Sequence, residues 1–159
     1  MNPQVLIERI RKPRMFLLDI IKDVSIEQLN QIPVGFANNI NWHLGHLMVA
    51  PLLICYLRAG LQPPVTENYI QLYRSGTKPG EPVSAEEAAT IKQMLFSSLD
   101  QLEKDLQNNL FTNYPTWSTR YGVELTSIED ALQFVIFHEG LHVGYVTYMK
   151  RLVNVMVNG

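Results

Sequence analysis

The chain has 159 residues, of which 47% are hydrophobic and 18% charged, and it carries a net charge of −2 and a single cysteine. These values predict one globular domain over residues 1–159, exclude an intrachain disulfide and argue against nucleic acid as a partner. The N-terminal residues are charged where a signal peptide is apolar, and the longest apolar run, residues 47–57, is too short to span a bilayer. We therefore expect a cytoplasmic protein without membrane contact.

Apolar residues at helical spacing predict a first long helix over residues 4–24. Pro13 lies inside this stretch. Because proline lacks a backbone N–H and crowds the preceding turn, it should bend or divide the helix there. Ser25 and Gln28 then have the spacing of a capping box, which predicts a short helix that Pro33 ends.

A second long helix is predicted from about Asn39 to about Ala59, with a kink at Pro51. Residues 61–83 are rich in proline and glycine and predict a long loop, of the kind that often covers a site. Arg74 in this loop would be placed to hold a substrate carboxylate, although a surface arginine is the simpler interpretation.

A third long helix is predicted over residues 84–110 and a fourth over residues 126–155. Capping boxes predict where both begin, namely Ser84 with Glu87 and Thr126 with Glu129. The stretch between them, residues 111–125, is aromatic and irregular, and it contains no convincing pair of strands. Four long helices with two long connections predict an all-α fold, a helical bundle.

The four histidines of the chain fall in two pairs, His43 with His46 on the second predicted helix and His138 with His142 on the fourth. Residues four apart lie about 40° apart around a helix, so both imidazoles of the second pair can point at one ion. Neutral imidazole suits zinc, nickel, copper or iron. A single histidine is more often a satisfied core residue than a ligand. Two facing helices, however, would bring three imidazoles to one metal ion.

The second pair also forms the motif H-E-x-x-H, which is typical of zinc protease helices. Such proteases take a third ligand from beyond the motif, and no His, Asp or Glu follows His142 in this chain. A protease is therefore disfavoured. The third ligand has to come from upstream, where His43 and His46 are the candidates.

Glu139, inside the motif, is the candidate catalytic residue, and the sequence leaves three interpretations open. It would be a general base for water activated by the metal, or a partner that orients a histidine N–H. Alternatively, it would be a carboxylate on the helix surface, paired with a neighbour across the bundle.

Three segments resemble the DinB family, in order along residues 15–152: NINWHLGHL, LYRSGTKPG and FHEGLHVGYVTYMKRL. The resemblance implies an up-and-down four-helix bundle with a long loop between the second and third long helices. It also implies a divalent metal ion, commonly nickel or zinc, on His46, His138 and His142, with His43 structural or supporting a ligand. Family members are often homodimers. Some are similar to isomerases or to transferases that use a low-molecular-weight thiol.

The chain departs from the family at one place. Many members carry an acidic residue about four positions after the first ligand histidine, where this chain has Val49, Ala50 and Pro51. The departure weakens the case for a hydrolase, which needs water activated beside the metal. The first functional hypothesis is therefore a metal-dependent enzyme acting on a small molecule, by analogy a thiol-dependent transferase, with a metal-dependent hydrolase as the alternative. The second is a non-catalytic metal-binding or interaction bundle.

Overall fold

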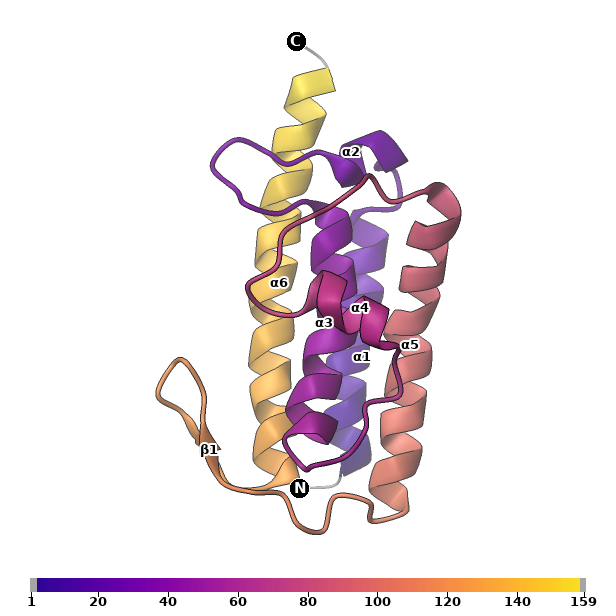
Figure 1. Ribbon diagram of the computed structural model, residues 1–159. Coiled ribbons are helices and arrows are strands. Elements are labelled where there is room, and N and C mark those ends of the chain that lie inside the picture. Colours follow the sequence, from indigo (N-terminus) through magenta and orange to yellow (C-terminus); the bar gives the residue numbers. More distant parts are fainter. Residues whose placement is uncertain (1–2, 158–159) are drawn as a thin grey trace.

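The computed structural model describes residues 3–157 of the chain, and the side chains of residues 3–155. Four long helices lie side by side along the molecule (Figure 1): α1 (Pro3–Ile20), α3 (Ile40–Leu52), α5 (Ala85–Gln107) and α6 (Ile128–Val157). Their main contacts form a ring, in which α1 and α3 each pack against both α5 and α6. The predicted all-α class is confirmed.

Helix α1 runs unbroken through Pro13, so the expected division of this helix is wrong, and the helix ends at Ile20 rather than near residue 24. Proline removes only one backbone donor, and buried side chains on both sides of it, such as Ile10 and Leu17, hold the helix against the core. The predicted capping box is confirmed, because Ser25 and Gln28 exchange hydrogen bonds at the start of α2 (Ile26–Asn30).

The second predicted helix is α3 followed directly by η1 (Leu53–Leu57), a π-helical turn. Pro51 has no N–H for the carbonyl of Leu47, four residues earlier, and the wider turn begins just after it. The guanidinium of Arg14 donates to that carbonyl oxygen at 2.5 Å. An arginine from another helix thus replaces the backbone donor that the proline removes.

All thirteen residues of α3 are buried, which explains why this stretch is so apolar. Together with η1, the 18 residues Ile40–Leu57 form a helical stretch that by length and composition alone could cross a membrane, so the apolar stretch is longer than the run of residues 47–57 that we judged too short from the sequence. However, 83% of this stretch is buried inside the protein, as is typical of the central helix of a core.

The connection over residues 61–83 is not a plain loop, because it contains α4 (Glu67–Tyr73), which packs across α3. Proline and glycine on both sides of α4 mark its ends and concealed it in the sequence. The ring of Tyr73 lies so close to Gly45 of α3 that a Cβ atom added to this glycine would overlap the ring. A residue without a side chain therefore allows α4 to approach the helix that carries His46.

Two further expectations concern how the last two long helices begin. Ser84 caps α5 as predicted, since its hydroxyl accepts the N–H of Glu87, and the Glu87 carboxylate accepts a hydrogen bond from the Tyr69 hydroxyl. Helix α6 is capped one residue later than predicted, because the hydroxyl of Ser127, rather than that of Thr126, accepts an N–H of the first turn. Adjacent hydroxyl residues are both able to cap, and the course of the preceding chain decides between them.

The stretch between α5 and α6 contains a minimal antiparallel pair of strands, β1 (Trp117–Ser118) and β2 (Glu124–Leu125), which the sequence did not predict. The pair is too short to show an alternating pattern. Its tip projects beside α6 (Figure 1). Trp117 fixes its base, since the indole N–H donates to the Tyr114 hydroxyl, which donates to the carbonyl of Ile54 in η1.

Candidate metal centre

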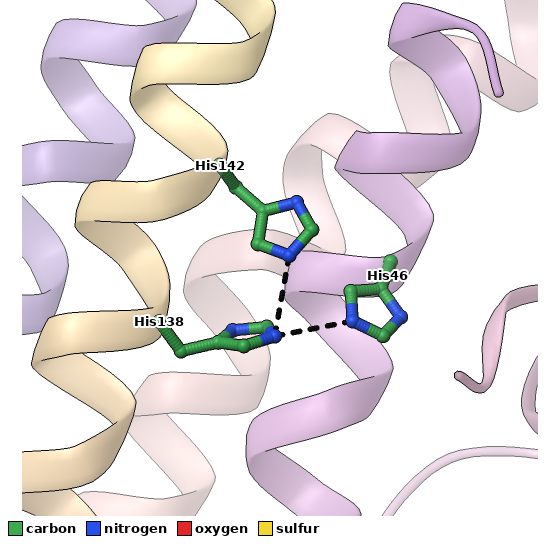
Figure 2. A group of neighbouring side chains, drawn as sticks. All are labelled: His46, His138 and His142. Atoms are coloured by element: carbon green, nitrogen blue, oxygen red, sulfur yellow. Dashed lines mark hydrogen bonds between the residues drawn. The ribbon is translucent and has the colours of Figure 1, made fainter. Parts of the chain in front are cut away.

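Three histidines from two helices meet in the structure: His46 of α3, and His138 and His142 of α6. Figure 2 shows the imidazoles turned toward one another in the space between these helices. The Nε2 atom of His138 lies 3.2 Å from Nε2 of His46 and 3.2 Å from Nε2 of His142. One ring nitrogen from each of the three lies within 4.8 Å of the others, and all three side chains are buried.

This spacing fits the coordination shell of a divalent transition metal. Nitrogen ligands bonded at about 2.0–2.1 Å in a tetrahedral arrangement lie about 3.3 Å from one another. Burial lowers the pKa of His138 to about 3 and also lowers that of His46 and His142, so the rings are neutral at physiological pH. A neutral imidazole has one unprotonated nitrogen, so each ring can present a lone pair to a cation placed between the three.

A carbonyl oxygen fixes the tautomer of His46. Its Nδ1 lies 2.7 Å from the carbonyl oxygen of Tyr73, at the end of α4. A carbonyl can only accept a hydrogen bond, so Nδ1 carries the proton and Nε2 presents its lone pair to the other two histidines. Backbone carbonyls orient metal-binding imidazoles in this way in many proteins. The helix inside the long connection therefore serves the site directly.

His43 supports the centre from the side. Its Nδ1 lies 2.7 Å from Nδ1 of His142, so one of these nitrogens donates to the other. When His142 donates, its Nε2 is left unprotonated, which is the form that binds a metal. Burial lowers the pKa of His43 to about 4, so this ring is a neutral partner. The structure thus places His43 in contact with His142 but outside the group of three converging nitrogens.

His138 differs from the other two rings in its second nitrogen. Within the part of the chain that the structure describes, its Nδ1 is buried and has no hydrogen-bond partner. An unpaired buried polar atom destabilises the fold by about 1–3 kcal/mol unless something compensates it. This nitrogen is not the one that faces His46 and His142, so the free electron pair that a metal needs remains available on Nε2.

Glu139 follows His138 directly, but its carboxylate lies elsewhere. It is fully buried against α1, where Arg14 donates to it from Nε at 3.1 Å and from a terminal nitrogen at 2.7 Å. The same guanidinium donates to the carbonyls of Leu47 and Leu95, and so links all four long helices. Both carboxylate oxygens are occupied and Glu139 does not line the pocket, so this geometry does not support a general base. It resembles the third interpretation, a carboxylate paired across the helices, but in the core and not at the surface.

An open pocket of about 1080 Å³ lies over the three imidazoles. Its walls come from residues 35–38, from residues 75–78 of the long connection, from the turn between β1 and β2, and from α6. Trp42 of α3 joins the histidine cluster to the long connection, because its ring stacks on His46 with the centroids 4.7 Å apart and its N–H donates to Thr77. The centre is therefore buried in the protein yet reachable by a small molecule.

The profile of the DinB superfamily matches residues 9–146 of the chain. The chain belongs to the DinB superfamily. Its buried three-histidine group fits a metal-binding protein of this kind. A comparison with curated proteins found no match.

The structure of this DinB protein brings together the three histidines that were expected as ligands and moves other candidates away. Arg74 is exposed outside the pocket and bonds Gln71, so the simpler interpretation, a surface arginine, holds. Arg120 lines the pocket instead.

Sequence reasoning missed three groups at or near the centre: the Tyr73 carbonyl, Arg14 and Arg120. The proline in the middle of α3 was the available signal for Arg14, since a helix carbonyl without a donor needs one from elsewhere. Nothing in the sequence pointed to the Tyr73 carbonyl or to Arg120, because both act through the way that connections fold over the helices.

Proposed function

We propose that this protein is a metal-dependent enzyme in which His46, His138 and His142 hold one divalent cation, nickel or zinc. The observation that carries the proposal is the convergence of three neutral imidazole nitrogens beneath an open pocket. Three protein ligands leave a coordination position for a substrate, which is typical of catalytic rather than structural sites. We also infer that the four long helices form the up-and-down four-helix bundle expected from the sequence.

The protein residues around the cation have separate tasks. When bound, the cation supplies a Lewis acid that favours the deprotonated form of a thiol or of water. The Tyr73 carbonyl holds the tautomer of His46, and His43 does the same for His142. The Arg14–Glu139 pair holds α1, α3 and α6 together one residue away from His46 and from His138.

We propose thiol-dependent transfer as the reaction. The thiol sulfur forms a bond to an electrophilic carbon of the second substrate, the leaving group departs with the bonding electron pair, and the thiol proton passes to solvent. Two observations favour transfer over hydrolysis. Among the described residues no Asp or Glu lines the pocket, so no carboxylate is placed to take a proton from water. The pocket volume of about 1080 Å³ also lies at the upper end of the range for ligand pockets, roughly 300–1,000 Å³, so a thiol has room beside a second substrate.

Two expectations about the protein in the cell complete this proposal. We propose that it is cytoplasmic, because its one cysteine, Cys55, is buried and unpaired, as is common in reducing compartments. We propose that it forms a homodimer, as the family resemblance suggests. Sedimentation of the purified chain tests the second point, and a monomer at micromolar concentration would contradict it.

The first experiment measures metal content and affinity in the purified full chain. We expect about one divalent ion per chain, and binding weakened more than about 100-fold by His46→Ala, His138→Ala or His142→Ala. His43→Ala is the matched control, a histidine of the same cluster outside the ligand set, and should weaken binding by only about tenfold. A protein that takes up no metal after reconstitution would refute the proposal. A larger loss in His43→Ala than in His46→Ala would show that the ligand on α3 is misassigned.

The second experiment separates transfer from hydrolysis. The metal-loaded protein is incubated with low-molecular-weight thiols and electrophilic substrates, and in parallel with esters and amides. We expect thiol consumption that His138→Ala abolishes. Turnover of esters or amides without thiol would favour the hydrolase, and no turnover in either panel would favour a non-catalytic metal-binding bundle.

A further inference from the structure

The pocket over the imidazoles carries charge of one sign only. Among the described residues that line it, the charged side chains are Lys78 and Arg120, and no carboxylate is present. The chain as a whole has 15 acidic and 13 basic residues, so the lining of the pocket differs in charge from the whole chain. A divalent cation on the three histidines would add further positive charge. Charge of one sign in a concave site concentrates ligands of the opposite sign.

Arg120 is the cation best placed to act at the centre. It stands in the turn between β1 and β2, where the buried Thr119 hydroxyl accepts the N–H groups of Tyr121 and Val123 and holds the turn. Its guanidinium lies over the Tyr121 ring, 4.9 Å from the centroid, and donates to the hydroxyl of that residue at 2.7 Å. Arg120 lines the same pocket as His46, His138 and His142, so a molecule bound over the imidazoles lies within its reach.

The guanidinium of Arg120 retains capacity for a ligand. Within the described part of the chain it donates one hydrogen bond, to Tyr121, and a guanidinium has five N–H donors in a planar fork. That fork matches the two oxygens of a carboxylate, sulfonate or phosphate group. The Tyr121 ring beneath it restricts its motion, so less conformational freedom is lost when an anion binds.

Six aromatic rings contribute to the lining of the pocket, together with the histidines and several aliphatic side chains. The six rings come from four different parts of the chain: Phe36, Trp42, Trp117, Tyr121, Phe134 and Tyr145. The Tyr145 ring also stacks on His43, with centroids 5.7 Å apart, so the aromatic wall continues to the edge of the histidine cluster. Such walls bury a flat or apolar ligand body, while a few polar groups fix its orientation.

We propose that the substrate of this pocket is an organic anion with an apolar body, and that Arg120 binds its anionic group while the aromatic rings enclose the body. Since this inference names the substrate class of the metal centre, it rests on the proposed function. Arg120 is the specificity-determining residue: it selects molecules that carry an oxyanion at a distance from the reacting atom. Lys78 lines both this pocket and a second cavity beside α4. Its ammonium group adds positive charge but has no planar fork of donors to orient an anion.

The test uses two fluorescent probes that differ in one charged group. 8-Anilinonaphthalene-1-sulfonate carries an aromatic body and an anion, and N-phenyl-1-naphthylamine carries the same body without the anion. Binding of each is titrated with the full-length chain, both as purified and after chelation. We expect Arg120→Gln to weaken the sulfonate about tenfold, the loss of one charge-assisted pair, and to leave the neutral probe unchanged.

Three further variants separate the explanations. Arg74→Gln, an exposed arginine of the long connection outside the pocket, should change neither probe. Phe134→Ala should weaken both probes alike, because it removes part of the apolar wall. Arg120→Lys should fall between the wild type and Arg120→Gln, because it keeps the charge but loses the fork. Thermal unfolding of each variant confirms that the fold is intact.

Two results would overturn the inference. One is sulfonate binding that Arg120→Gln leaves unchanged; the other is sulfonate binding that depends on the metal alone and vanishes on chelation regardless of residue 120. These two results can be distinguished from a failure of the proposed function. A chain that takes up no metal, yet loses sulfonate affinity in Arg120→Gln, would retain the anion site and refute only the metal-dependent reaction.

Discussion

His138 and Glu139 are neighbours on α6, yet they belong to two buried polar clusters of opposite character. Toward α3, His138 joins His46 and His142 in a group of three neutral rings whose Nε2 atoms converge, and its own Nδ1 has no partner among the described residues. Toward α1, Glu139 meets Arg14, whose donors also satisfy the carbonyls of Leu47 and Leu95.

The two clusters differ in whether their polar groups are all paired within the protein. The Arg14–Glu139 cluster is complete without any ligand: its charges are paired and its carbonyls have donors, so its task is structural. The histidine cluster, by contrast, carries no charge of its own and opens to a pocket, so a small molecule or an ion can reach it. The H-E-x-x-H motif spans both clusters, because adjacent residues on a helix point about 100° apart.

The largest effect is expected from a substitution that breaks the Arg14–Glu139 cluster. Arg14→Met leaves the Glu139 carboxylate buried without a partner, and should lower the free energy of unfolding by about 3–5 kcal/mol in urea titrations. The matched control is Arg11→Met on the same helix, because Arg11 pairs with half-exposed carboxylates such as that of Glu8, and should cost at most about 1 kcal/mol. Equal costs in the two variants would show that the buried pair is not what holds the helices.

The double variant Arg14→Met/Glu139→Met sharpens the same point. It removes both charges together, so no ion is left uncompensated, and we expect it to be more stable than Arg14→Met alone. If the double variant were the less stable of the two, the pair would be contributing more than mutual neutralisation.

A smaller effect is expected where α4 meets α3. In Gly45→Ala the new methyl group would overlap the Tyr73 ring, and overpacking of this kind destabilises a protein by about 1–3 kcal/mol. Since the Tyr73 carbonyl orients His46, metal affinity should fall as well. The control, Gly140→Ala on α6, meets no atom within 4 Å and should stabilise the protein by about 0.5–1 kcal/mol. Unchanged metal affinity in Gly45→Ala would show that the Tyr73 carbonyl does not influence metal binding by the histidine cluster.

The smallest expected effect concerns protons at the histidine cluster in chelated protein. Burial lowers the pKa of His43 to about 4 in the folded state, below its value in the unfolded chain. The unfolded state then binds more protons, so this histidine contributes stability above about pH 6.5 that is lost as the pH falls toward 4. We expect His43→Phe to reduce the loss of unfolding free energy between pH 7 and 5 by about 1 kcal/mol. The same pH slope in both proteins would contradict the lowered pKa.

Local patterns in the sequence predicted much of this molecule. Apolar spacing and the predicted caps, Ser84 and Thr126, located the long helices to within a few residues, because helix periodicity and capping act over only three or four positions. The same periodicity placed His138 and His142 on one face, and the absence of later ligands required a third from upstream. The family resemblance supplied the choice of His46, which the residues alone left open between His43 and His46.

The tertiary structure decided what depends on contacts between distant segments. Arg14 and Glu139 are 125 positions apart, and no local rule links them. The Tyr73 carbonyl reaches His46 because α4 folds over a glycine, and Arg120 reaches the pocket because a two-residue strand pair turns toward α6. The helices and two of the expected ligands, His138 and His142, could be predicted from the sequence because helical geometry is set by neighbouring residues. The role of Glu139 and the walls of the pocket could not, because packing selects among partners that the sequence only makes available.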